Sequence, residues 1–158
     1  MDSFRISGLA EHDFTPLFAL GDDELGARHI ERVTAVTSPG YPCRVSLVDA
    51  EVGEELLLLP FEHQHAASPY RASGPIFVRR GASLRQLPAG EIPPYVSTRL
   101  ISLRAYNATH RMIHAEVCEG IAVAQSIARA FANAEIAYLH LHNAKQGCYS
   151  CRVDRISL

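Results

Sequence analysis

Four consecutive leucines, Leu56 to Leu59, constrain the fold of this chain more than any other segment. Successive side chains along a strand point to opposite faces of a sheet, so a run without a polar position must bury both faces. The segment from Glu55 to Phe61 is therefore predicted to be the central strand of a sheet, with almost no leucine side chain in contact with water.

Other alternating segments predict further strands around this one. Ser97 to Tyr106 alternates between apolar and polar positions, and Met112 to Val117 follows after a short turn, which is the pattern of a hairpin. Ile113, Ala115 and Val117 are expected to face the core. The remaining strand segments are 4–7, 30–36, 43–48, 75–79, 136–142 and 148–156.

One longer helix and two shorter ones complete the predicted fold. Apolar residues at steps of three or four predict a helix from about Glu119 to Ala132 with one face on the sheet. Phe14 to Leu20 and Asp22 to His29 are expected to be short N-terminal helices. The chain is thus predicted to be α+β, with a largely antiparallel sheet of seven or eight strands and a helix in its C-terminal half packed on one face.

The length and composition fit one soluble domain spanning residues 1–158. Apolar residues make up 47% of the sequence and charged residues 20%, and no apolar run approaches the ~18 residues of a membrane span. The first residues lack the basic-then-apolar order of a signal peptide, so a cytoplasmic location is expected. The net charge of −2 provides no general attraction to nucleic acid or to an anionic membrane, so neither is an expected partner.

The four cysteines, Cys43, Cys118, Cys148 and Cys151, are expected to be free thiols in a reducing compartment. Cys148 and Cys151 have the spacing of a zinc or redox pair, but the segment that holds them is predicted to be extended. Residues three apart in a strand face opposite sides. The two sulfurs should therefore neither chelate one zinc ion nor form a disulfide with each other.

Residues 62–75 form a polar loop that leaves the leucine strand and collects groups able to bind a ligand. Loops at the ends of buried strands are favoured binding places because the scaffold beneath them is rigid. His63, Tyr70 and Arg71 are candidate ligand-binding residues, and the planar guanidinium of Arg71 suits a carboxylate or phosphate. The alternative is a solvated loop in which Arg71 pairs with an acid such as Glu62.

Residues 140–149 form a second polar loop with a different chemistry. His142, Asn143 and Cys148 bracket a tight turn, and a thiol near an imidazole can be activated as a nucleophile. His142 and Cys148 are therefore the candidate catalytic pair, and Asn143 is a candidate for ligand binding or for orienting the imidazole ring. The alternative is a small buried thiol that packs like an apolar side chain.

Two His-x-His pairs, His63 with His65 and His140 with His142, lie in these two loops. Residues i and i+2 of an extended chain share a face, so each pair can direct two imidazoles at one point. A metal site of all four histidines is therefore an alternative, because imidazole is the commonest metal ligand. The carboxylate that a cupin would supply soon after the first pair is absent, since residues 66–73 contain no Asp or Glu.

Several short segments, spread over almost the whole length, are specific in combination. They are Phe4–Leu9, Ser38–Leu47, Ser68–Arg71, Ile76–Arg79, His142–Cys148 and Arg152–Arg155. Together they resemble a bacterial family, domain of unknown function 1203. The resemblance implies a single-domain bacterial protein and supplies no activity, cofactor or catalytic residue.

The residues therefore predict a small polar or anionic ligand in a cleft between loops 62–75 and 140–149, with enzymatic turnover left open and no cofactor specified. Two alternatives belong to other classes: a metal-binding protein that uses the two His-x-His pairs, and a non-catalytic interaction domain that forms a homodimer. Convergence of both loops on one concave pocket would favour the first function. Four imidazole nitrogens within about 2.1 Å of one ion would favour metal binding, and wide separation of the loops would favour the interaction domain.

Overall fold

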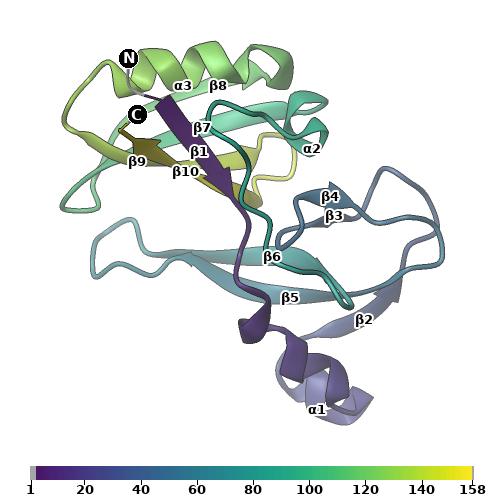
Figure 1. The fold of residues 1–158 in the computed structure, drawn as a ribbon. Helices are drawn as coiled ribbons and strands as arrows, with labels where there is room; N and C mark the ends of the chain where they lie inside the picture. Colours follow the sequence, from purple (N-terminus) through teal and green to yellow (C-terminus); the bar gives the residue numbers. More distant parts are fainter. Residues whose placement is uncertain (1–2, 158) are drawn as a thin grey trace.

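The computed structural model describes residues 3–157 and arranges their strands in two five-stranded sheets (Figure 1). The α+β class is confirmed, whereas the prediction of one sheet with seven or eight strands is wrong. Alternation along a strand identifies the side chains that share a face, but it does not identify the neighbouring strand. A single sheet and two stacked sheets therefore have the same sequence pattern.

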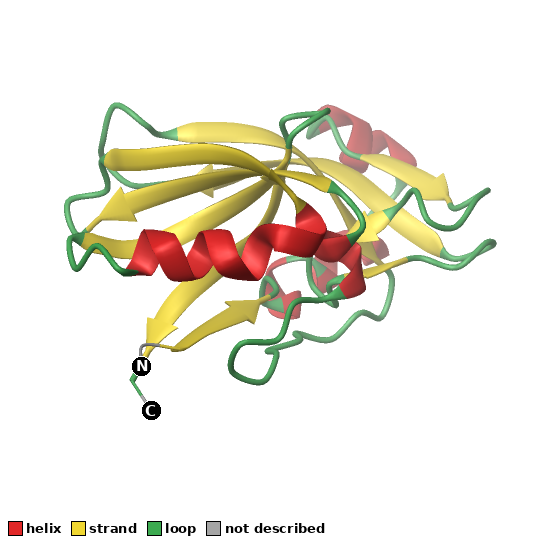
Figure 2. Cartoon of the chain, turned by 90° about the horizontal axis from the view of Figure 1, so that it is seen from above, coloured by secondary structure: helices red, strands yellow, loops and turns green. Residues whose placement is uncertain are grey.

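Sheet A has the strand order β1-β10-β9-β7-β8, and every neighbouring pair in it is antiparallel. Its strands are β1 (Ser3–Ser7), β7 (Leu100–Asn107), β8 (Met112–Glu119), β9 (Ile136–Asn143) and β10 (Tyr149–Ile156). The predicted helix is confirmed as η3 (Gly120–Ala122) followed by α3 (Val123–Phe131). It lies across one face of sheet A (Figure 2) and forms the larger core with the inward residues of β7, β9 and β10. A short helix, α2 (Pro94–Ser97), precedes β7.

Sheet B has the order β2-β5-β6-β3-β4 and is mixed, because β3 runs parallel to β6 while the other pairs are antiparallel. Its strands are β2 (Glu31–Thr34), β3 (Pro42–Cys43), β4 (Val48–Asp49), β5 (Glu55–Gln64) and β6 (Ala72–Arg79). The predicted N-terminal helices are present as η1 (Glu11–Asp13), η2 (Thr15–Ala19) and α1 (Asp22–Ala27). No helix in residues 3–157 is long and apolar enough to cross a membrane.

The leucine strand is internal to sheet B, as predicted, with β2 on one side and β6 on the other. Leu56 and Leu57 have no exposed surface, Leu59 is 6% exposed, and Leu58 is half-buried. The two faces are covered by different groups. Leu57 and Leu59 pack with side chains of η2 and α1, whereas Leu56 packs against Ala35 and Ala50.

The β7–β8 hairpin is confirmed, but the prediction that Ile113, Ala115 and Val117 face the core is wrong. Ile113 is 38% exposed and Val117 63% exposed. The opposite face of β8 is the one that meets α3, through Cys118 in the core and an ion pair of Glu116 with Arg129. β8 is an edge strand, so nothing else in residues 3–157 pairs with its outer side.

The face of sheet A opposite α3 meets β5 of sheet B through aromatic and polar side chains. Phe61 and Tyr149 bring their ring centroids within 6.0 Å. Gln64 donates a 3.0 Å hydrogen bond from Nε2 to the hydroxyl of Tyr138. The predicted bounds of the two polar loops are wrong, because residues 62–64 and 72–75 belong to β5 and β6, and residues 140–143 and 149 belong to β9 and β10. The polar side chains near the ends of these strands therefore lie at the contact between the two sheets.

Candidate functional site

Three of the four predicted histidines meet between the sheets. His140 and His142 share one face of β9, as the i, i+2 spacing predicts, and His63 reaches them from β5. The ring centroid of His63 lies 4.8 Å from that of His142 and 6.2 Å from that of His140. Tyr149 stacks on His63 with a centroid distance of 5.7 Å.

Burial disfavours the charged form of these three histidines. Removal from water lowers the pKa of His140 and of His142 to about 3, and the same cause lowers the pKa of His63. Nδ1 of His142 lies 3.0 Å from the carbonyl oxygen of Gly147, which can only accept, so Nδ1 carries the proton. The hydrogen bond therefore holds the turn between β9 and β10 against the imidazole ring.

The histidines do not form a metal centre in their present positions. His65 is exposed and stands outside the cluster. Within residues 3–157, no group of three or more His, Cys, Asp or Glu side chains is arranged to hold a metal ion. Three buried nitrogens of the cluster, Nδ1 of His63, Nδ1 of His140 and Nε2 of His142, have no hydrogen-bond partner in residues 3–157.

The outer part of loop 62–75 lies at the far end of the sheets from the β9–β10 turn. Ser68 donates from Oγ to the carbonyl oxygen of His110, in the turn of the β7–β8 hairpin. Arg71 pairs with Glu62, at 3.1 Å from Nη2 to Oε1, which is the alternative that the sequence left open. Tyr70 packs edge-on against Tyr106. The structure therefore does not bring Tyr70 and Arg71 to Asn143 and Cys148.

Asn143 and Cys148 instead line a cavity of about 350 Å³ beside the β9–β10 turn. Sheet B and the segments beside β3 contribute Gly40, Pro42, Arg44, Leu58, Pro75 and Phe77 to its wall. Arg99, from the segment between α2 and β7, and Gln146, from the β9–β10 turn, complete the lining. An adjoining cavity of about 400 Å³ shares Arg99, Asn143 and Gln146 with it and adds Thr98, Leu100, Glu119 and Lys145.

Arg44 is the buried charged residue in the wall of this cavity. Its side chain is buried, with 1% of the residue exposed. It donates from Nε to the carbonyl oxygen of Tyr149 at 2.7 Å, from Nη1 to that of Pro42, and from Nη2 to Sγ of Cys148 at 3.2 Å. None of these acceptors is a carboxylate, and the described residues form no ion pair with Arg44. A buried guanidinium therefore stands in the wall without an acidic counter-ion.

Two further wall residues, Arg99 and Asn143, differ in whether their polar groups have partners. Arg99 is compensated, because Asp49 accepts from both of its terminal nitrogens at 2.7 and 3.1 Å. Asn143 is 5% exposed and donates from Nδ2 to Sγ of Cys148 at 3.6 Å. Its Oδ1 is buried and has no hydrogen-bond partner among the described residues. Among the described residues, Asn143 thus has a buried oxygen without a hydrogen-bond partner, whereas each nitrogen of Arg44 has a partner and only its charge lacks an acidic one.

Sequence reasoning missed Arg44 and Arg99. Each is a single arginine beside a turn, with no neighbouring group of a recognisable site pattern. Their guanidinium groups reach the cavity only because β3 and the segment after α2 pack beside the β9–β10 turn. Periodicity and spacing do not encode that contact, so the sequence contained no signal that could have found it.

A family model described as "Protein of unknown function (DUF1203)" matches residues 40–155. The chain belongs to this family. The resemblance inferred from the short segments is therefore confirmed. No curated protein and no solved structure matches the chain. All residues that line the cavity at Arg44, from Gly40 to Cys148, lie within the matched DUF1203 domain.

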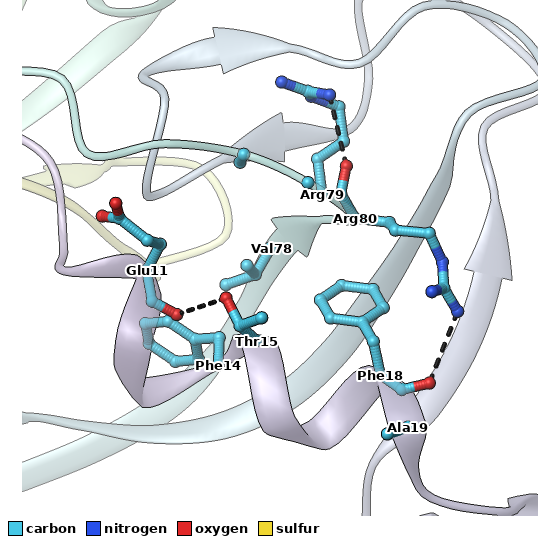
Figure 3. A pocket seen from close by; sticks show the side chains of 10 residues that line it. Glu11, Phe14, Thr15, Phe18, Ala19, Val78, Arg79 and Arg80 are labelled. Carbon is cyan, nitrogen blue, oxygen red and sulfur yellow. Dashed lines mark hydrogen bonds between the residues drawn. The ribbon is translucent and has the colours of Figure 1, made fainter.

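A different cavity, of about 310 Å³, lies partly outside the DUF1203 match, against η1 and η2 (Figure 3). Its polar groups have partners. The hydroxyl of Thr15 donates to the carbonyl oxygen of Glu11, and Arg80 donates to that of Phe18 and pairs with Glu55. The two arginines of this cavity pair with Glu54 and Glu55, and the Glu11 carboxylate accepts from the backbone N–H of Leu84. Among the described residues this cavity therefore presents no cation without an acidic partner, in contrast to the cavity at Arg44.

Proposed function

We propose that this protein binds a small organic anion in the cavity beside the β9–β10 turn. The observation that carries the proposal is the Arg44 guanidinium, which is buried in the cavity wall without a carboxylate partner. Removal of a cation from water is unfavourable unless an opposite charge compensates it. An anion in the cavity would supply that charge, and a guanidinium binds carboxylates and phosphates through directed hydrogen bonds.

The other walls indicate the class of anion. Leu58, Pro75 and Phe77 give the cavity an apolar side opposite the turn. Its volume of about 350 Å³ is within the usual range for sites that hold small organic molecules. We therefore favour a carboxylate or phosphate ester with an apolar part over a bare inorganic ion. Oδ1 of Asn143 would accept a hydrogen bond from an N–H or O–H group of the ligand.

This proposal keeps Asn143 and Cys148 as ligand-facing residues and moves the anion contact from Arg71 to Arg44. Arg71 already pairs with Glu62, and both groups lie away from the cavity. His142 has a positioning role, because its Nδ1–H holds the carbonyl oxygen of Gly147 and so fixes the turn. His63 lies behind His142 and supports the ring.

Calorimetric titration with succinate, with a phosphate monoester and with the neutral analogue succinamide tests the proposal. Gln146 is exposed and lines the cavity, so changing it should not disturb the fold. Gln146→Glu adds a negative charge without changing the shape and should weaken anion binding about tenfold, equivalent to about 1.4 kcal/mol. Gln146→Ala is the matched control, and Arg71→Ala should leave the affinity unchanged.

Two results would contradict the proposal. One is succinamide binding as tightly as succinate, because charge would then contribute nothing. The other is loss of anion binding in Arg71→Ala together with full binding in Gln146→Glu. That result would place the anion site at Arg71, in the outer part of loop 62–75.

A further inference from the structure

We infer that Cys148 is the covalent-modification site of this cavity, and that its sulfur exchanges with disulfides that carry a negative charge near the reacting bond. The preference for a negative charge rests on the proposed anion site. The exchange itself rests on the surroundings of the sulfur, which differ from those of the other three cysteines.

The other three cysteines lie in an apolar core or pack against one. Cys43 and Cys151 have 0% and 1% of their surface exposed, and burial raises the pKa of the Cys151 thiol to about 12. Cys118 is half-buried and packs against the core under α3. Cys148 is half-buried as well, but it lines a cavity and accepts from two side-chain donors, Arg44 and Asn143. One of those donors is a cation.

The balance of charge around Arg44 assigns a role to this sulfur. The guanidinium has three acceptors: two backbone carbonyl oxygens, of Tyr149 and Pro42, and Sγ of Cys148. Neither carbonyl oxygen can form a bond to an incoming disulfide, whereas the sulfur can. The buried cation has no charged acceptor among the described residues, so an anionic disulfide drawn to it would meet the sulfur that lies 3.2 Å from Nη2.

A second feature of the wall points to an incoming molecule. Oδ1 of Asn143 is buried and has no hydrogen-bond partner in residues 3–157, and Asn143 lines the same cavity as Cys148. It is an acceptor that an N–H or O–H group of a disulfide compound can satisfy. The cavity therefore combines a cation, a sulfur and an unused acceptor in one place.

Exchange suits these residues better than hydrolysis. A cysteine hydrolase needs a base that takes the thiol proton and returns it to the leaving group. Nδ1 of His142 is committed to Gly147, and no hydrogen bond joins this ring to Cys148 in residues 3–157. Attack on a disulfide needs no base held by the protein, because the leaving sulfur departs as a thiolate and takes no proton from a side chain.

The step is balanced without any other reactant. The thiolate of Cys148 attacks one sulfur of the disulfide, and a new S–S bond forms between the protein and that half of the molecule. The original S–S bond breaks, and its electron pair leaves on the second sulfur as a thiolate. Cys148 and the departing sulfur exchange oxidation states, so no external oxidant or reductant takes part.

The test compares an anionic and a neutral disulfide on the full chain carrying Cys118→Ser. The anionic probe is dithiobis(nitrobenzoate), the neutral probe is dithiodipyridine, and each rate is divided by the rate with free cysteine. Release of the chromophore gives the rate, and peptide mass spectrometry locates the adduct. We expect the adduct on Cys148, with the normalised rate about tenfold higher for the anionic probe. Cys148→Ser should abolish the reaction.

Gln146→Glu should lower the rate with the anionic probe and leave the rate with the neutral probe unchanged. Gln125→Glu, which adds the same charge at an exposed position of α3, should change neither rate. A normalised rate for Cys148 in the wild-type chain no higher than that of Cys118 would overturn the inference, while succinate binding by calorimetry would still support the proposed function. Fast reaction with equal normalised rates for both probes would also overturn it, because the anionic preference would be absent. If the wild-type chain failed to bind succinate while the probe rates were as expected, that result would contradict the proposed function only.

Discussion

Nε of Arg44 donates a 2.7 Å hydrogen bond to the carbonyl oxygen of Tyr149, a residue 105 positions further along the chain. The same guanidinium donates to the carbonyl oxygen of Pro42, on β3. One side chain thus connects sheet B to the first residue of β10 in sheet A. Because Arg44 also forms the cavity wall, the stability of the sheet contact and the shape of the candidate site depend on the same group.

Arg44→Lys should destabilise the protein although it keeps the positive charge. An ammonium group lacks the planar fork and cannot reach the acceptors at Pro42, Cys148 and Tyr149 together. We expect the free energy of unfolding to fall by about 2–4 kcal/mol, because hydrogen bonds from charged groups are lost in a buried place. Urea denaturation measures the change. The exposed Arg71→Lys is the control, with a change of at most about 0.5 kcal/mol; equal effects would contradict the structural role of Arg44.

Leu57→Ala should destabilise the protein more than Leu58→Ala. Leu57 has no exposed surface and packs in the core with η2 and α1, whereas Leu58 is half-buried and borders the cavity. Removal of a fully buried leucine side chain leaves a void and should lower the free energy of unfolding by about 2–5 kcal/mol. Thermal and urea denaturation of both variants checks the order, and a larger loss in Leu58→Ala would show that the two faces of β5 have been interchanged.

The free energy of unfolding should fall as the pH is lowered from about 6.5 toward 3. Burial lowers the pKa of His140 and His142 from 6.5 to about 3, so in this window the unfolded chain binds protons that the folded chain does not. At about pH 5 the loss should be roughly 2 kcal/mol for each histidine. The side chains of Arg104 and Arg152, near the cluster, oppose protonation of His140 further.

A series of urea denaturation curves across this pH window measures the effect. His140→Gln and His142→Gln should each reduce the slope of stability against pH. His12→Gln is the control, because the side chain of His12 is 80% exposed. An unchanged slope in both cluster variants would mean that other groups cause the acid sensitivity.

Gly120→Ala should be strongly destabilising, although glycine is usually the weaker residue in a helix. A Cβ atom at this position would lie 2.1 Å from the carbonyl oxygen of Val96 and 2.5 Å from that of Arg99, so η3 could not stay against α2. The matched control is Gly26→Ala in α1, where a Cβ meets nothing within 4 Å. That change should stabilise the protein by about 0.5–1 kcal/mol. Thermal denaturation of the two variants should therefore give shifts of opposite sign.

Local pattern was enough to predict much of the secondary structure. The leucine strand, the β7–β8 hairpin, the helix after it and the pairing of His140 with His142 on one face all follow from side-chain periodicity, which is a property of a few consecutive residues. Periodicity could not decide which face of β8 meets α3. Both faces of that strand carry apolar residues, and Val117 is exposed while Cys118 is half-buried and packs against the core.

The sequence by itself determined the α+β class, the family and the residues rich in chemistry, because each of these depends on composition, short-range order or a string of matching segments. Only the tertiary structure decided that the strands form two sheets and that Arg71 pairs with Glu62. It also decided that Arg44 meets Cys148 across 104 positions. Such contacts depend on which strands stack and at what register, and many sequences with the same pattern of apolar and polar positions would place those two side chains apart.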